Sequence, residues 1–199
     1  MYGAEVAQNR QITDPEVLKA LTQPLRRRLY RLLGQFGPAT AGMLAKRTDH
    51  DPGQVAYHLR ELARHGFVEE APELARDRRE RWWRAAPDDW GWSSLDFTEP
   101  EGRAAAETLM AQMLAESVER LRAFNQIRDV WPQEWQRSSV INHSQLWLTA
   151  EELRGLTAEL TEVIRRHSEP GKLARESTVQ PEDSRESVHL AFYAFPERP

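Results

Sequence analysis

The 199-residue sequence contains no cysteine. This absence excludes disulfide bonds, thiolate nucleophiles and metal sites with thiolate ligands, and it is compatible with a cytoplasmic location, which we expect. No apolar run approaches the roughly 18 residues that a membrane helix needs, and the first residues lack the pattern of a signal peptide. We therefore expect a folded protein with no membrane partner.

Lysine is scarce, and arginine supplies almost all of the positive charge. The charge is unevenly distributed along the chain. Residues 26–84 carry 13 basic and 8 acidic side chains, whereas residues 91–199 carry 12 basic and 18 acidic ones. The net charge of −4 thus conceals a basic N-terminal part, and such a part suggests a polyanionic partner.

The usual catalytic patterns are also missing. The sequence has no glycine-rich phosphate loop, no nucleophile elbow, and no serine, histidine and acid arrangement with supporting spacing. His143, His167 and His189 fall on three separate predicted elements without the spacing of metal ligands, so we interpret them as ordinary surface or core histidines. We expect no enzyme, no cofactor and no metal.

Helix start and stop signals divide the first 66 residues into four predicted helices. Asp14 followed by Pro15 opens the first helix, and Pro24 opens the second. Thr40 is the predicted N-cap of a short third helix, and Asp51 followed by Pro52 opens the fourth. Gln54 gives this fourth helix the spacing of a capping box, and Gly66 ends it.

The fourth helix has the two faces of a DNA-recognition helix. Val55, Leu59 and Leu62 form its apolar face. The predicted outward positions offer hydrogen-bonding side chains and are Gln54, Tyr57, Arg60, Glu61 and Arg64, with His58 on the border. Glutamine can bind adenine, and arginine can bind guanine or phosphate. We take Gln54, Tyr57, His58, Arg60 and Arg64 as candidate DNA contacts; the alternative is an ordinary surface helix.

A predicted hairpin follows, with strands over residues 67–71 and 80–85. Its tip carries Arg76, Arg78 and Arg79. Arginines at such a tip can straddle a phosphate or enter the minor groove, so we add these three to the candidate contacts. The alternative is a solvated turn in which nearby acidic side chains pair with the arginines.

The C-terminal half is predicted to begin with a capping box, Thr98 to Glu101, that opens a long helix ending near Val130. Its apolar positions indicate pairing with a second copy. Strands are predicted over residues 139–148 and 187–195. A helix over residues 150–167 is predicted between them, opened by a capping box at Thr149.

Seven tryptophans are unusual for this length. Trp82 and Trp83 are adjacent in a predicted strand and must point to opposite faces. Trp131, Trp135 and Trp147 lie near the junction of the long helix and the following strand. We favour a structural core for these three; the alternative is a pocket for a small apolar or aromatic ligand.

Three sequence stretches resemble the ArsR-like winged-helix regulators: ALTQPLRRRLYRLLG, ATAGMLAKRTDHDPGQVAYHLRELARHGFVEE and RDRRERWWR. The resemblance implies a homodimeric repressor that releases operator DNA when an inducer binds. His58-Leu59 and Gly66-Phe67-Val68 match the family pattern. Ala56 stands where the family usually has serine, so a hydroxyl contact is lost. The cysteine motif of metal-sensing members is replaced by residues 41–46, which favours a metal-independent member.

We therefore predict an α+β protein, with a winged helix-turn-helix DNA-binding domain over residues 11–86. Residues 97–199 form the predicted region for dimerisation and effector sensing, with the long helix and a small β-α-β unit. The predicted partners are an operator in double-stranded DNA, a second copy of the chain, and a small ligand as effector. Two alternatives remain open: a winged helix that binds protein, and a small-molecule-binding or enzymatic domain with a DNA-binding appendage.

Overall fold

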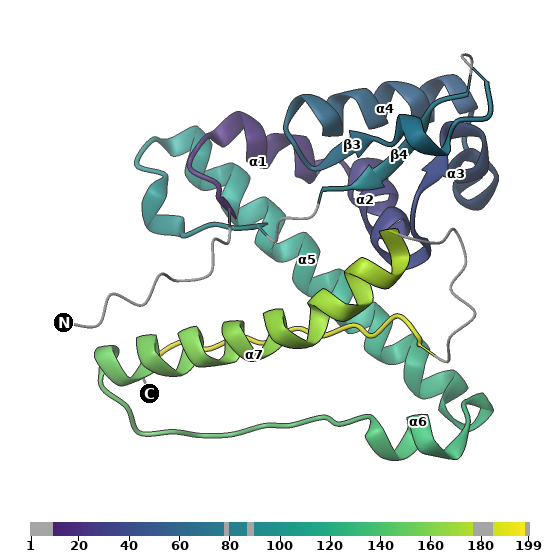
Figure 1. The fold of residues 1–199 in the computed structure, drawn as a ribbon. Helices are drawn as coiled ribbons and strands as arrows, with labels where there is room; N and C mark the ends of the chain where they lie inside the picture. The colour runs from purple at the N-terminus through teal and green to yellow at the C-terminus, as the bar shows by residue number, and fades with distance from the viewer. Residues whose placement is uncertain (1–9, 78–79, 87–89, 177–184, 198–199) are drawn as a thin grey trace.

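The computed structural model describes residues 10–77, 80–86, 90–176 and 185–197 (Figure 1). Its helices and strands follow one another in the order β1 (Arg10–Gln11), α1 (Pro15–Thr22), α2 (Pro24–Phe36), β2 (Ala39–Thr40), α3 (Ala41–Thr48), α4 (Pro52–Arg64), β3 (Val68–Glu70), β4 (Trp82–Ala85), β5 (Trp90–Gly91), α5 (Pro100–Ile127), α6 (Gln133–Ser138) and α7 (Ala150–Glu176). The mixture of helices and short strands confirms the predicted α+β class, with a winged helix-turn-helix followed by a long helix.

The predicted caps explain where the N-terminal helices begin. Asp14 accepts a hydrogen bond from the Glu16 backbone N–H at 2.9 Å. Thr40 accepts one from Met43 at the start of α3. Asp51 accepts from the backbone N–H groups of Gly53 and Gln54, and thereby satisfies two donors at the start of α4.

Gly66 ends α4 for two reasons. Its φ of +70° lies in the left-handed region that glycine adopts without strain. A Cβ at this position would also lie 2.8 Å from the guanidinium of Arg10. That guanidinium donates hydrogen bonds to the carbonyls of His65 and Gly66, so β1 is fastened to the end of α4.

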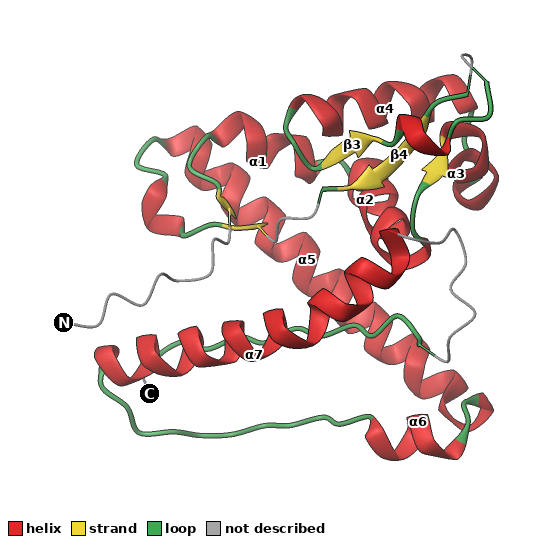
Figure 2. Ribbon diagram, in the orientation of Figure 1, coloured by secondary structure: helices red, strands yellow, loops and turns green. Residues whose placement is uncertain are grey.

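The strands form two small sheets, shown in yellow in Figure 2. β3 and β4 pair antiparallel, with Val68 opposite Ala85 and Glu70 opposite Trp83, which confirms the predicted hairpin. β2 joins the other edge of β4 and gives the order β2-β4-β3, a third strand that the sequence did not predict. β1 and β5 form a separate parallel pair.

One hydrophobic core holds the N-terminal part together. The apolar face of α4 lies at its centre, because Val55, Leu59 and Leu62 have no exposed surface. The first turns of α5 join the same core through Ala105, Ala106 and Leu109. α5 therefore begins against the N-terminal part, on α1, before it extends away from it (Figure 1).

Two predicted features of the C-terminal half are confirmed. α5 and the single turn that follows it end at Val130, as predicted. At the start of α7, Thr149 and Glu152 form the predicted reciprocal capping box, with the Thr149 N–H donating to Glu152 at 2.7 Å.

Other predictions for this half are wrong. Residues 139–149 and 185–197 form no strand in the described part of the chain. Both segments are rich in apolar residues, but a strand also needs a hydrogen-bonded neighbour, and no backbone pairing with a neighbouring strand is present for either segment among the described residues. The small β-α-β unit is therefore absent here. α7 continues to Glu176 rather than ending at residue 167. At α5 the N-cap is Glu99, not Thr98, and it forms no side-chain cap bond.

The tryptophans are also only partly as predicted. Trp83 belongs to the core, whereas Trp82, its neighbour on β4, is buried outside that core cluster. The rings of Trp131 and Trp135 lie 6.3 Å apart, but Trp147 is fully exposed. A core role is thus wrong for Trp147.

Candidate nucleic-acid interface

The outer face of α4 presents most of the predicted contact residues together. Gln54, Arg60 and Arg64 are exposed, and the Tyr57 side chain is 49% exposed. Because the opposite face of the helix is anchored in the core, these side chains project from a fixed backbone. Glu61 lies among them but is held at 3.6 Å by Arg26 and by Arg64. The free hydrogen-bonding groups of this face are therefore amide, phenol and guanidinium.

His58 is the exception among the predicted contacts. It is only 7% exposed, and it accepts a long hydrogen bond, 3.4 Å, from the Arg26 Nε to its Nδ1. Burial lowers the pKa of His58, and the charges of Arg26 and His50 lower it further. His58 thus lies behind the exposed face, as a neutral group that helps to position α4 against α2.

The depressed pKa of His58 predicts a loss of stability in acid. The unfolded chain binds this proton near pH 6.5, while the folded chain resists it to lower pH. The unfolded state then holds more protons in the window below about pH 6.5, so the free energy of unfolding falls as the pH drops through that window. Urea denaturation at several pH values measures the fall, and His58→Gln should reduce it. His143→Gln, at an exposed position, is the control and should leave the fall unchanged. If the free energy of unfolding of His58→Gln falls with pH as much as that of the wild type, His58 is not the cause.

Arginines of α2 hold the interface in place rather than extending it. Arg27 donates to Glu116 at 2.9 Å and to Gln112 at 2.6 Å, both on α5, and to the Leu21 carbonyl. Arg28 donates to the Arg47 carbonyl at the end of α3. The sequence showed a run of arginines on α2 but not their partners, since these lie up to 89 residues away.

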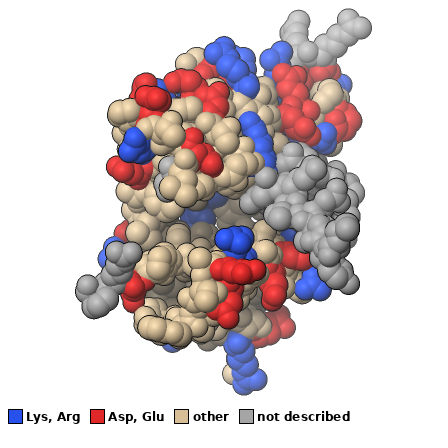
Figure 3. Space-filling view, turned by 90° about the vertical axis from the view of Figure 1, so that its left-hand side faces the viewer, with Lys and Arg blue, Asp and Glu red and all other residues tan. Residues whose placement is uncertain are grey.

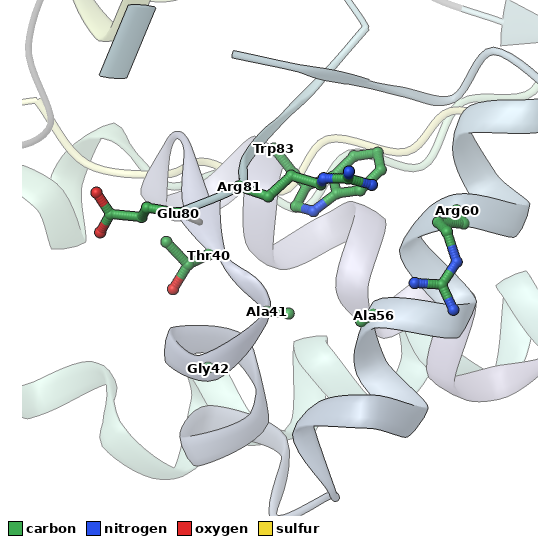
Figure 4. A pocket seen from close by; sticks show the side chains of 8 residues that line it. All are labelled: Thr40, Ala41, Gly42, Ala56, Arg60, Glu80, Arg81 and Trp83. Atoms are coloured by element: carbon green, nitrogen blue, oxygen red, sulfur yellow. The ribbon is translucent and has the colours of Figure 1, made fainter. Parts of the chain in front are cut away.

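A hollow of about 270 Å³ separates α4 from the hairpin. Figure 4 shows Arg60 on its α4 side and Glu80 and Arg81 on its hairpin side. Ala56 contributes only a methyl group to the floor between them. A polyanion lying across this hollow would meet guanidinium groups from both sides.

The hairpin itself is only partly described. Arg76 is exposed, and its backbone N–H donates to the Glu80 carboxylate at 2.9 Å. Arg78 and Arg79 lie outside the described residues, so their placement stays a prediction. At the base of the hairpin Arg84 binds Glu69 and Glu73, each at 2.6 Å. Nearer the tip, Arg81 lies 3.4 Å from Glu70, so pairing with acidic neighbours is not confined to the base.

The charge distribution, the acidic and histidine side chains and the helix lengths describe the rest of the surface. Basic and acidic side chains are interspersed on the face seen in Figure 3. Among the described residues, no group of three or more histidine and acidic side chains could hold a metal ion. Likewise, none of the helices within the described ranges is both long and apolar enough to cross a membrane.

Comparison with known proteins supports the architecture of the N-terminal part. Residues 21–71 match the model of a helix-turn-helix domain. A crystal structure described as a possible transcriptional regulator for arsenical resistance is 27% identical, over 54% of this chain and 93% of that one, with a TM-score of 0.31. An apo double mutant of ZitR from Lactococcus lactis is 15% identical, over 75% of this chain and 87% of that one, also with a TM-score of 0.31.

No curated protein matches the chain. The two structural likenesses superpose too poorly to add to the domain match. That match spans α2, α3, α4 and β3, and so includes the exposed outer face of α4. Residues 21–71 are a helix-turn-helix domain.

Proposed function

We propose that the protein is a sequence-specific regulator of transcription that binds double-stranded DNA as a homodimer. The observation that carries this proposal is the outer face of α4, on the second helix of a helix-turn-helix. Its exposed side chains are Gln54, Tyr57, Arg60 and Arg64. A helix with one anchored face and one hydrogen-bonding face fits the major groove, where each base pair presents a distinct pattern of donors and acceptors.

Within this proposal the groups divide by role. Gln54 reads adenine, and Arg60 reads guanine or holds a phosphate beside the hollow. Tyr57 contacts a phosphate or a thymine methyl group. The arginines of the hairpin tip bind phosphates and position the protein without reading sequence. We further propose a repressor in the cytoplasm whose DNA binding is modulated by a non-metal effector, and no catalytic activity.

Footprinting of the purified protein on the DNA upstream of its own gene tests the proposal directly. A protected site of one helical turn or more, with affinity that falls steeply with salt, is the expected result, because neutralised phosphates release counterions. Binding that is absent or indifferent to salt would contradict the proposal and favour a winged helix that binds protein.

Removing either base-reading side chain should weaken specific binding. For Gln54→Ala and for Arg60→Ala we expect a loss of about 1–3 kcal/mol each, with the fold intact because both side chains are exposed. Titration of labelled operator measures the loss. Arg154→Ala, an exposed arginine on α7, is the matched control. Wild-type operator affinity in both variants would show that α4 is not the recognition helix.

Neutralising the hairpin tip should act on all DNA sequences alike. Replacing Arg76, Arg78 and Arg79 together by alanine removes up to three phosphate contacts, so the slope of log affinity against log salt should become shallower by up to about three. Binding measured at several salt concentrations gives the slope, for operator and for unrelated DNA. A triple variant of Arg122, Arg128 and Arg154 provides the control. An unchanged slope would mean that the hairpin points away from DNA.

A further inference from the structure

The C-terminal region carries a long helix that has little to pack on. Residues 139–149 run extended and exposed from α6 to α7. In the view of Figure 1, α7 passes in front of α5, and it does not pack extensively on any other helix or strand of the described part. Helices in water owe most of their stability to the packing of an apolar face, so α7 needs a surface to cover.

Two apolar stripes of matching length remain open. On α5 the stripe steps by four, four and three residues and consists of Met110, Leu114, Val118 and Leu121, each 39–48% exposed. On α7 it steps by three, four and three and consists of Leu153, Leu156, Leu160 and Val163; the first two are partly buried, and the last two are 38% and 41% exposed. At 1.5 Å per residue the stripes are about 16 and 15 Å long. Such ridges are suited to pack on one another.

The α5 stripe is not the surface that α5 uses within its own chain. The core contacts of α5, at Ala105, Ala106 and Leu109, lie about 130° around the helix from the stripe. The C-terminal segment follows that other side: the Tyr193 hydroxyl lies 3.4 Å from Ser117, and Arg120 donates to His189 at 3.0 Å. Neither the core contacts nor the contacts with the C-terminal segment cover the α5 stripe, whose side chains stay 39–48% exposed.

The total surface indicates how much a partner would cover. The chain exposes 14967 Å², whereas a folded monomer of its mass exposes about 9,600 Å². The extended segments 139–149 and 185–197, which are exposed, supply part of the difference. The difference, about 5,400 Å², exceeds the roughly 1,000–2,500 Å² that each chain covers in an obligate dimer interface.

We propose that two copies exchange their C-terminal arms, so that α7 of each copy packs its stripe on the α5 stripe of the other. The proposal rests on the homodimer of the proposed function and adds the segment that completes its interface. Residues 139–149 act as the tether, because eleven extended residues reach up to about 36 Å. Within one chain, the α5 stripe stays 39–48% exposed, and Leu160 and Val163 of α7 stay 38% and 41% exposed, so a second copy is the occupant that covers both.

The absence of cysteine makes the test direct, since introduced thiols are the only ones present. Chains with Leu121→Cys and chains with Leu160→Cys, of different length through a tag, are co-expressed and oxidised. We expect a covalent heterodimer on a non-reducing gel. The control pairs Leu160→Cys with Glu119→Cys, which lies on another face of α5. The stripe pair should exceed it about tenfold, because a disulfide forms only when the Cβ atoms are within about 4.5 Å.

Three outcomes would overturn the exchange. The first is that the double variant Leu121→Cys/Leu160→Cys closes a disulfide within one chain. The second is that Leu121→Cys alone crosslinks as well as the mixture does, which would mean that the two α5 stripes face each other. The third is that no crosslink forms although ultracentrifugation shows a dimer. Operator binding, measured on the same samples, reports separately on the proposed function, since it depends on α4 and the hairpin.

Discussion

Replacing Leu114 and Leu121 by aspartate should turn the dimer into monomers. Both side chains lie in the open stripe of α5, 48% and 42% exposed in the single chain. Covering them with a partner would bury two carboxylates in each copy without a counter-charge, at a cost of several kcal/mol of association, or roughly a hundredfold or more in Kd. Analytical ultracentrifugation measures the change.

The same variant should bind operator DNA as a single half-site does. A two-fold partner places two recognition helices about one turn of DNA apart and doubles the phosphate contacts, and monomers lose both advantages. The N-terminal core should stay folded, because the stripe lies outside it. Arg122→Asp with Gln126→Asp, exposed positions off the stripe, is the matched control. A dimer of undiminished affinity would place the interface elsewhere, such as on α1.

Truncating Leu59 to alanine should have the largest effect on stability. Leu59 is fully buried at the centre of the apolar face of α4. Its loss removes the transfer energy of the deleted atoms and leaves a cavity, at a cost of about 2–5 kcal/mol. The free energy of unfolding of a typical domain is about 5–15 kcal/mol, so this change removes a large fraction of it. Urea denaturation measures the loss, and operator affinity should fall with the folded fraction.

Leu95 provides the matched control for that experiment. It is 87% exposed, so Leu95→Ala deletes the same atoms where no core closes over them. The expected change is within about 0.5 kcal/mol. Equal losses in the two variants would show that the α4 face is not the centre of the core.

The sequence predicted the N-terminal half well because its signals are local. Asp14, Thr40 and Asp51 each satisfy backbone donors two or three residues away, so the helix starts can be read without the rest of the fold. Gly66 is equally local, since only a small residue takes the left-handed turn after α4. The exposed side of α4 followed from the same periodicity.

The errors arise where the outcome depends on distant partners. His58 sits on the border of the helical wheel, and only the position of Arg26 on α2 shows that it lies inside. The segments 139–149 and 185–197 are rich in the apolar residues that strands favour, but a strand forms only beside a partner strand, and the pattern of one segment does not identify that partner. Thr98 fits a capping box, but its carbonyl instead accepts a hydrogen bond from Arg103.

The bonds of Arg27 have a mechanical consequence. Arg27 donates hydrogen bonds to Gln112 and Glu116 of α5, which lie one helical turn apart, and to the Leu21 carbonyl at the end of α1. α5 cannot slide or roll against α2 without breaking these bonds together. In the proposed assembly of two copies, the N-terminal part of each copy would therefore rotate together with its α5 as one rigid body. The rotation would be about the contact at which α5 crosses α7 of the other copy. A few degrees of change in that crossing angle would be magnified into ångströms at the far tips, where the separation of the two α4 helices is set.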